Sequence, residues 1–425
     1  MWRLMRTGFA GALLGTMFSS GAAAQRPMTW DEIKARFEAN NPTLSAGAIG
    51  IDEAKAEEIT AFLRPNPQAS LGVDQVGATG KGPFNEAVLN ASVSYLHERQ
   101  HKRELRLQSA KQGTDITISQ QDDLDRTLLF ALRSAFVGAL QAKAVLAVVN
   151  ANLAYWDKVL DVSRTRFQVG DIAQIDLDRL ELQRSQFESD VQTAEVNLRT
   201  SKITLLALLN ERTPIDKFDV TGAFDFNEQL GPLDEFRQTA MDNRPDLRAA
   251  VQAVDKAKTD HKLAVANGST DPTINVDAGF PGVSQDYVNY TPFLHEYVGV
   301  SVSIPLRIFD RNQGEKLRTQ LDIDRDQKLL DAQKAQVFND VDSGYAQVIS
   351  NLILLRPYRQ RYVQQAVRVR ETVRFAWEHG GASLLDFLSA EQDFRSVQLN
   401  YVNLIGSYLL AAAQLNMAVG REAIQ

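Results

Sequence analysis

Four short segments of the chain alternate strictly between apolar and small or polar residues. They are residues 67–76, 87–96, 272–280 and 297–304. In the first segment Ala69, Leu71 and Val73 alternate with polar or small neighbours. A period of two is typical of strands with one apolar face. This pattern suits transmembrane barrel strands, and it suits equally well edge hairpins that pack on a soluble core.

The number of these segments favours the barrel only in an oligomer. The four strands of one chain cannot close a barrel, and open strand edges cannot face lipid. Two chains would supply about eight strands, and side chains would fill the interior of such a barrel. Three chains would supply about twelve strands, which form a barrel wide enough for a conduit. A barrel therefore requires several chains, and a channel favours a trimer.

Helical periodicity fills most of the remaining chain. Residues 102–169 contain no proline, and their only two glycines are Gly113 and Gly138. If helical throughout, this segment of roughly 68 residues extends about 100 Å at 1.5 Å per residue. The C-terminal segment has apolar residues at alternating spacings of three and four: Phe387, Ala390, Phe394, Val397, Tyr401, Leu404, Tyr408, Ala411 and Leu415. That heptad seam predicts coiled-coil packing. Residues 177–208 keep the rhythm, with Arg184 interrupting it.

Several segments occur twice in register. Residues 30–44, WDEIKARFEANNPTL, are echoed by residues 233–247, LDEFRQTAMDNRPDL, with a shared N-x-P-x-L core. Asparagine suits a helix end, and proline fits the first position of the next helix. Residues 163–183 resemble residues 372–392, which pairs Gly170 with Gly380 and Asp176 with Asp386. A tandem repeat of about 200 residues therefore divides the chain into residues 25–229 and 230–425.

Composition and the N-terminus restrict where the protein works. The net charge is −7, cysteine is absent, and no polybasic tract is present, so we expect no nucleic-acid partner, disulfide or lipidated cysteine. Residues 1–24 combine a basic start, about 11 apolar residues and a small-residue end, which predicts a cleaved export signal. No later stretch has the roughly 18 apolar residues of a spanning helix, so membrane entry would be through β-strands.

Four stretches resemble the TolC-type outer-membrane factor family. They are the two N-x-P-x-L segments and, in addition, RFQVGDIAQIDLDRLE (166–181) and EHGGASLLDFLSAEQ (378–392). PNPQASLGV (65–73) and IPLRIFDRNQGE (304–315) are similar to its heavy-metal, cobalt–zinc–cadmium branch. The resemblance implies an α+β membrane protein: a homotrimer with a twelve-stranded barrel in the outer membrane of a Gram-negative bacterium and a periplasmic tunnel of helical hairpins. It also implies a periplasmic adaptor, an inner-membrane resistance–nodulation–division pump and passive export of small solutes, with heavy-metal cations as the cargo of this branch.

The same resemblance implies a pore constriction near the periplasmic tips. Asp386 matches an acidic constriction residue of the family, and Asp176 is its repeat mate, whereas a second family acid is replaced by Ser389. Ser383 and Asp386 also form a capping-box pattern, so pore lining and helix capping are both open for Asp386. Gly170 and Gly380 are expected to supply the turns, where left-handed backbone suits glycine. The tips, including Asp171 and Ser383, are the expected adaptor contacts.

One motif suggests a different function. HERQH (97–101) matches the H-E-x-x-H pattern of zinc proteases. Aligned on the repeat, however, His97 falls on Phe309 and His101 on Gln313, and the residues between the histidines are polar. We therefore interpret HERQH as a strand-to-helix junction, and expect no catalytic set, cofactor or resident metal. A secreted zinc protease and a non-transporting periplasmic coiled-coil scaffold are the alternatives.

Overall fold

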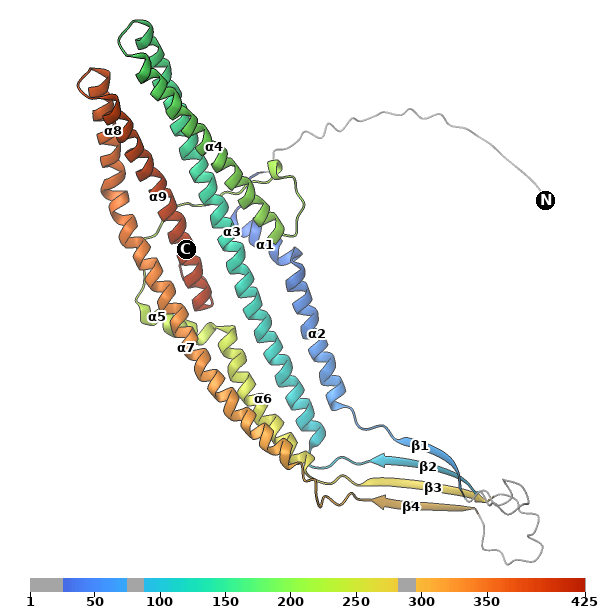
Figure 1. Cartoon of the computed structure of the whole chain (residues 1–425). Helices are drawn as coiled ribbons and strands as arrows, with labels where there is room; N and C mark the ends of the chain where they lie inside the picture. The colour runs from blue at the N-terminus through green and yellow to red at the C-terminus, as the bar shows by residue number, and fades with distance from the viewer. Residues whose placement is uncertain (1–25, 75–87, 282–295, 425) are drawn as a thin grey trace, which may run out of the picture.

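The computed structural model describes residues 26–74, 88–281 and 296–424, and it is a long helical body with a small sheet at one end (Figure 1). The export signal predicted at residues 1–24 lies outside the described residues. The elements, in order, are α1 Trp30–Asn40, α2 Pro42–Phe62, β1 Gln68–Asp74, β2 Val88–Leu96, α3 Lys102–Gln168, α4 Gln174–Leu208, η1 Ile215–Lys217, α5 Leu233–Asn243, α6 Pro245–Asn267, β3 Thr273–Pro281, β4 Tyr297–Ser303, α7 Gln313–Pro357, η2 Tyr358–Tyr362, α8 Val363–Glu378 and α9 Leu384–Val419.

The order of elements is the same in the two halves: two helices, two strands and a long helical hairpin. Both N-x-P segments break a helix as expected, because α1 ends at Asn40 before Pro42 and α5 ends at Asn243 before Pro245. Asn41 caps α2 by accepting hydrogen bonds from two backbone N–H groups, at 2.9 and 3.2 Å. The division into two sequence repeats remains a prediction.

The helices form a wall instead of a compact bundle. Near the sheet, neighbouring helices follow the order α2, α3, α6, α7, and near the opposite end α4, α3, α9 and then α7 or α8. Helix α3 contains 67 residues, as the sequence predicts, and runs through both parts of the wall (Figure 1). The buried apolar residues accordingly form four separate clusters along the wall.

The predicted heptad seams are buried between helices. On α9, Phe387, Ala390, Phe394, Tyr408, Ala411 and Leu415 are all buried. Arg184, which interrupts the seam of α4, points to a neighbouring helix, where its Nε donates to Asp157 Oδ1 at 2.6 Å. Helix α7 ends at Pro357 and continues through a π-helical segment into α8, a feature that the sequence pattern does not predict.

Two helices contradict the sequence prediction about membrane-spanning segments. Helices α3 and α9 each contain an 18-residue window that is long and apolar enough to cross a membrane, contrary to the prediction that no such stretch exists. The small residues of these windows raise their hydropathy without making a continuous apolar run. Within the monomer 33% and 50% of these windows are buried, and both helices pack against other helices of the wall. Their composition therefore fits packed helices of the wall.

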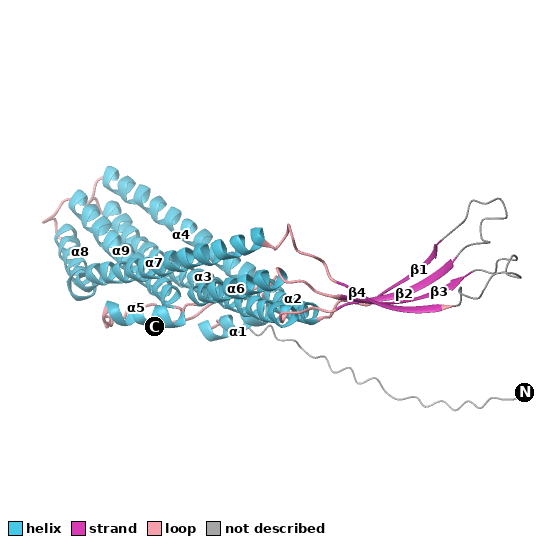
Figure 2. Ribbon diagram, turned by 90° about the horizontal axis from the view of Figure 1, so that it is seen from below, coloured by secondary structure: helices cyan, strands magenta, loops and turns pink. Residues whose placement is uncertain are grey.

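The four strands form one antiparallel sheet in the order β1-β2-β3-β4. Their bounds agree with the four alternating segments to within a few residues at each end. The sheet extends beyond the helical body (Figure 2), and β1 and β4 are its outer strands. Each chain therefore supplies a strip of sheet with two unpaired edges.

Candidate functional site

The sheet has one continuous apolar face. Its register places Leu71 opposite Ala91, Ala91 opposite Ala278, and Ala278 opposite Val298. The next row likewise joins Val93, Val276 and Val300. These side chains are not covered by the helical body: Leu71 is 86% exposed, Val298 77% and Val300 73%. An apolar face of this extent, left open to the surroundings, is typical of contact with lipid or with another protein.

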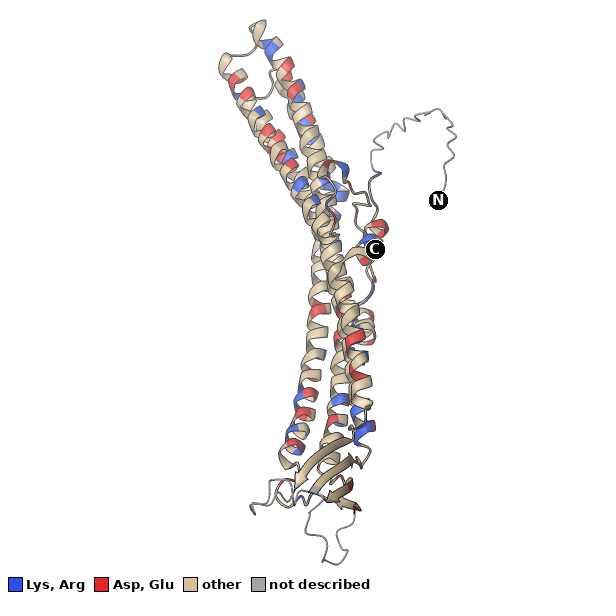
Figure 3. Cartoon of the chain, turned by 90° about the vertical axis from the view of Figure 1, so that its right-hand side faces the viewer, with Lys and Arg blue, Asp and Glu red and all other residues tan. Residues whose placement is uncertain are grey.

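The opposite face of the sheet is polar. Its aligned rows include Ser92, Asp277, Asn275 and Ser301, and the charged residues of the molecule lie mainly on the helices (Figure 3). Asn275 Nδ2 donates to Ser301 Oγ at 3.5 Å across two strands. Among the described residues neither face of the sheet meets a core, so the arrangement does not fit a hairpin packed on a soluble core. The alternation predicted from the sequence is confirmed as a two-faced sheet.

The HERQH segment is a strand-to-helix junction, as predicted. It lies between the end of β2 and the start of α3, so its histidines do not share a helix face. Glu98, the would-be general base, is bound in two hydrogen bonds by the Arg106 guanidinium. His101 is the N-cap of α3 in a left-handed conformation, with a φ of 55°. Within the described part of the chain no group of three or more acidic or histidine side chains could hold a metal ion. The geometry required of a zinc protease is therefore missing.

The starts of α3 and α7 differ by one residue from the sequence alignment of the repeat at this junction. Helix α7 begins at Gln313, and its N-cap Asn312 has a φ of 61°, matching His101 at the start of α3. The helix starts pair His101 with Asn312, whereas the sequence alignment of RELR (103–106) on EKLR (315–318) pairs Gln100 with Asn312. Gln100 is left-handed as well, with a φ of 59°.

The two hairpin tips lie at the opposite end of the wall from the sheet (Figure 1). Gly170 and Gly380 have φ values of +78° and +76°, the left-handed turn expected of glycine at the end of a helix. Asp171 accepts a hydrogen bond from Arg166 Nε at 2.5 Å, which closes the first tip. The turn roles of both glycines are thus confirmed, while adaptor contact at the tips stays a prediction.

Asp386 forms the predicted capping box. Its backbone N–H donates to Ser383 Oγ at 3.1 Å, and its carboxylate accepts from the Ser383 backbone N–H at 3.0 Å. The Ser383 hydroxyl also donates to the Asp386 carboxylate at 2.6 Å. This bond and, next, the one from the Ser383 backbone N–H hold the pKa of Asp386 below its ordinary value, so the exposed carboxylate is ionised at neutral pH. Asp176 lies at the same position of α4, but the N-cap there is Ala173, which provides no side-chain cap. Whether either aspartate lines a pore stays a prediction.

An aromatic cluster, which the sequence analysis did not identify, holds the two hairpins together near their tips. Trp156 of α3 lies 6.0 Å from Phe387 of α9, and Phe387 stacks on Trp377 of α8 at 4.4 Å. Phe187 of α4 completes the contact, at 5.0 Å from Trp156. Heptad spacing indicated that Phe187 and Phe387 are core residues, but spacing alone cannot show that they share a core.

A buried polar contact reinforces this connection. Tyr155 of α3 donates its hydroxyl to Glu391 of α9 at 2.9 Å, and Glu391 is only 6% exposed. Burial raises the pKa of Glu391 above its ordinary value, and it also raises the pKa of the Tyr155 hydroxyl. Arg370 stacks over the Tyr155 ring at 5.0 Å and is bonded to Glu371 at 2.6 Å. The contact joins hairpins that lie more than two hundred residues apart in the chain.

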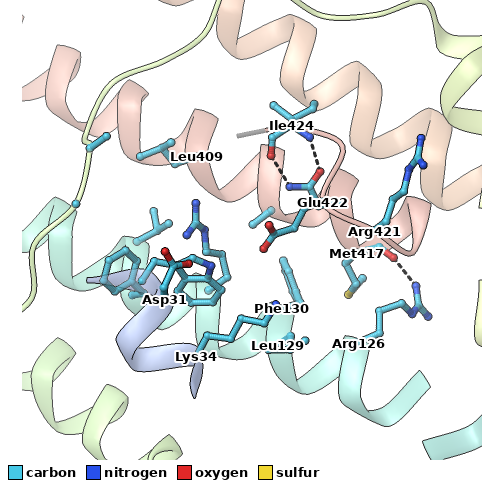
Figure 4. Close-up of a pocket in the computed structure, with 18 of the residues that line it drawn as sticks. Asp31, Lys34, Arg126, Leu129, Phe130, Leu409, Met417, Arg421, Glu422 and Ile424 are labelled. Atoms are coloured by element: carbon cyan, nitrogen blue, oxygen red, sulfur yellow. Dashed lines mark hydrogen bonds between the residues drawn. The ribbon is translucent and has the colours of Figure 1, made fainter. Parts of the chain in front are cut away.

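A hollow of about 1340 Å³ lies midway along the wall. Asp31 and Lys34 of α1, Arg126 of α3 and Glu422 after α9 surround it (Figure 4). Arg126 donates to the Met417 carbonyl at 2.5 Å, and Asn416 binds the backbone of Ile424. Cations and anions alternate around this space, so its lining favours no single class of charged ligand.

Comparison with known proteins agrees with this architecture. Residues 236–421 match the family model described as outer membrane efflux protein. The cobalt-zinc-cadmium resistance protein CzcC of Cupriavidus metallidurans is 21% identical over 408 residues, which cover 94% of this chain and 91% of that protein. The outer membrane protein TolC of Vibrio cholerae is 23% identical over 424 residues, with 97% and 94% covered.

Solved structures share the fold. A crystal structure of CusC superposes with a TM-score of 0.78 at 15% identity and covers 92% of both chains. The outer-membrane channel OprN gives a TM-score of 0.75 at 14% identity, with 92% of this chain and 89% of that chain covered. Through the family match of residues 236–421, these relatives and the shared fold, the chain is similar to the TolC-type outer membrane efflux proteins, with resemblance to their heavy-metal branch.

Proposed function

We propose that the chain is the outer-membrane channel of a tripartite efflux system. Three copies would close a twelve-stranded barrel in the outer membrane, and their helical walls would form a tunnel through the periplasm. A periplasmic adaptor and an inner-membrane resistance–nodulation–division pump would complete the route. The channel would be a passive conduit, exported by a cleaved and non-lipidated N-terminal signal.

The observation that carries this proposal is the two-faced sheet with two unpaired edges. An apolar face can be exposed to lipid, but an unpaired edge cannot, because its N–H and C=O groups would lack partners there. Pairing β1 of one copy with β4 of the next satisfies both edges and keeps the apolar face outward. Three copies close a barrel with a polar interior wide enough for solutes.

The helical wall supports the same arrangement. Its two edges carry exposed apolar residues, such as Leu182 and Val196 on α4 and Leu317 and Ile353 on α7. Apolar residues on opposite edges of a curved wall suit contact with neighbouring copies. We infer that each α7–α8 edge meets the α2–α4 edge of the next subunit.

The tips would form the entrance and the adaptor contact. Asp386 and Asp176 are the candidate constriction residues, and three facing carboxylates would repel one another unless a cation bridges them. Gly170, Asp171, Gly380 and Ser383 lie in or beside the two turns and are the candidate adaptor contacts. Asp386 is exposed, so its capping hydrogen bonds leave part of its side chain open to the surroundings.

Heavy-metal cations are the cargo that we favour. The support is the similarity to CzcC, whose name gives cobalt, zinc and cadmium resistance, at 21% identity. A conduit needs no tight site for its cargo, so this choice rests on relatedness alone. Gene deletion followed by growth on zinc, cobalt and cadmium tests it: increased sensitivity is expected, and unchanged growth on all three would contradict it.

Two assays test the channel itself. Detergent-extracted protein should migrate as a heat-modifiable trimer on gels, and it should produce stepwise conductance in planar bilayers. A water-soluble monomer without conductance would contradict the proposal and favour a periplasmic scaffold. In the same bilayers Asp386→Ala should increase conductance or weaken cation preference. Reduced thermal stability with unchanged conductance per channel would instead leave Asp386 with only its capping role.

A further inference from the structure

One charged side chain lies on the polar face of the sheet. Among the strand residues whose side chains the structure describes, Asp277 is the only charged one. The register places it between Ser92 of β2 and Gly299 of β4. It follows Thr273, the first residue of β3, by four positions, which is about 13 Å along a strand at 3.3 Å per residue. The carboxylate therefore lies in the middle of the sheet and not at its rim.

The carboxylate occupies a space that a glycine leaves open. A Cβ atom at position 299 would lie 2.7 Å from one carboxylate oxygen of Asp277 and 3.0 Å from the other, so the side chain leans across β4 over Gly299. In the next row the ring of Tyr297 covers Gly279 in the same way. These two glycines let the aspartate and the tyrosine lie against the polar face, which fixes the position of the carboxylate on it.

No positive charge accompanies Asp277. Among the described residues no hydrogen bond or ion pair joins its carboxylate to another group. In the adjacent rows of β3 and β4 the residues on the same face are neutral: Asn275, Ser301, Gly279 and Tyr297. An unpaired charge is costly against lipid, so ionisable residues within a membrane face a water-filled space. Half-buried Asp277 meets this condition only if the polar face lines an aqueous lumen.

Three copies of the chain would repeat this carboxylate around the lumen at one level. About twelve strands, spaced by about 4.8 Å and tilted by about 40°, form a barrel with a radius of about 12 Å. Carboxylates that extend inward from such a wall lie about 13–16 Å apart. That separation is too large for them to share one cation, because the oxygen ligands of a metal ion lie at about 2.0–2.6 Å. The three groups would therefore act through their electrostatic field and not as a chelating site.

We propose that Asp277 of each copy forms a charge filter that makes the barrel lumen favour small hydrated cations over anions. This inference rests on the proposed trimeric barrel and assigns the charge preference of its outer end to one residue. Carboxylates that surround an aqueous space with low-dielectric walls concentrate cations there and exclude anions. The filter lies at the opposite end of the molecule from Asp386, so the two can be tested separately.

Charged thiol reagents test the filter locally, because the chain contains no cysteine. Ser301→Cys places a thiol on the polar face in the row next to Asp277, and Ala278→Cys places one on the apolar face. Detergent-extracted trimers of each full-length variant are treated with a cationic or an anionic methanethiosulfonate of similar size. Mass spectrometry gives the two rates of modification, and their ratio is normalised to the ratio for a small free thiol.

The filter predicts that the cationic reagent modifies the Ser301→Cys thiol about five- to tenfold faster at about 0.01 M salt, where the Debye length is about 30 Å. Asp277→Asn in the same chain should bring the ratio close to one, whereas Asp277→Glu should preserve the preference. At about 1 M salt, where the Debye length is about 3 Å, the preference should disappear. Asp331→Asn, on an exposed position of α7, is the matched control for the loss of one charge per chain and should leave the ratio unchanged.

Two results would overturn the filter and leave the proposed channel intact: the same ratio with and without Asp277→Asn, or a ratio that does not change with salt while Asp277 is present. The salt comparison needs no change at Asp277, so it holds even where Asp277→Asn does not assemble into trimers on a gel. Modification of Ala278→Cys with protection of Ser301→Cys would instead contradict the orientation of the sheet, on which both proposals depend.

Discussion

The two hairpin tips have the same helix–turn–helix form, with Gly170 and Gly380 at their turns, yet they are held in different ways. In the first tip Glu181 is 45% exposed and binds Arg164 of its own hairpin at 2.9 Å. In the second tip the corresponding Glu391 is buried and binds Tyr155 of the other hairpin. Arg374, the counterpart of Arg164, pairs instead with Glu371 at 2.6 Å. One tip is closed on itself, and the other is attached to its neighbour.

The turns differ in the same sense. The second hairpin begins α9 with a complete capping box, whereas the first begins α4 at Ala173 without a side-chain cap. A rigid turn and a buried connection define the position of the second hairpin relative to α3. In the proposed channel, whose entrance the tips would form, this difference predicts that the two hairpins make unequal contributions to the stability of the entrance. The following predictions test this inequality, from the largest effect to the smallest.

The aromatic cluster should contribute most. Phe387 is fully buried between Trp156 and Trp377, so Phe387→Ala should lower the free energy of unfolding of the tip region by about 3–5 kcal/mol. Leu177, its counterpart in the first hairpin, lies outside that cluster, and Leu177→Ala should cost about 2 kcal/mol. Hydrogen exchange of the tip helices measures both. Equal losses would contradict the inequality.

The two glutamates should respond differently to the same substitution. Glu391→Ala leaves the half-buried Tyr155 hydroxyl without its acceptor and should cost about 1–3 kcal/mol. Glu181→Ala removes an exposed ion pair and should cost at most about 1 kcal/mol. Thermal unfolding in detergent compares them, with Tyr155→Phe as the variant that removes the donor but keeps the ring. A greater loss for Glu181 would reverse the assignment of the two tips.

The caps allow a reciprocal exchange. Ser383→Ala should destabilise the start of α9 by about 1 kcal/mol, because the backbone N–H of Asp386 loses its acceptor. Ala173→Ser should add the missing cap before Asp176 and stabilise α4 by up to about 1 kcal/mol. Limited proteolysis at the two turns reports both changes. No protection in the Ala173→Ser variant would show that the first tip differs for another reason.

The smallest effect is a dependence on pH. Burial raises the pKa of Glu391, so the folded tip favours the protonated carboxyl more than the unfolded chain does. Its stabilising contribution is complete below the ordinary pKa of 4.5 and is lost as the pH rises through the higher pKa of the folded state. The residues facing it are Tyr155, Arg370, Glu371 and Arg374.

Glu391→Gln should remove this dependence. The difference in melting temperature between the Gln variant and the unmodified protein should widen as the pH rises, since only the unmodified protein must bury a charge. Glu181→Gln, at the exposed counterpart, is the control and should show no such trend. A constant difference for Glu391→Gln would show that the carboxyl does not titrate in this range.

Local patterns predicted much of this fold. The four alternating segments became strands with nearly the expected bounds, and both N-x-P segments became helix breaks. The turn at Gly170 and Gly380 and the cap at Asp386 were also predictable, because glycine conformation and capping depend on a few adjacent residues.

Contacts between distant helices were not predictable in the same way. The Tyr155–Glu391 bond and the shared aromatic cluster join α3 to α9, and the Arg244 guanidinium bridges Asp246 and Asp340. Each depends on which helix faces which, and periodicity reports only that a residue is on an apolar face.

Pairing of β1 with β4 between neighbouring copies is the central claim, and cysteine cross-linking measures it most directly. The chain contains no cysteine, so Leu71→Cys on β1 can be combined in turn with Val298→Cys, Val300→Cys or Val302→Cys on β4. We predict that one of these pairs, oxidised in isolated outer membranes, gives a covalent species of three chains and nothing larger. Monomers only, or an open series of larger oligomers, would contradict a closed trimeric barrel.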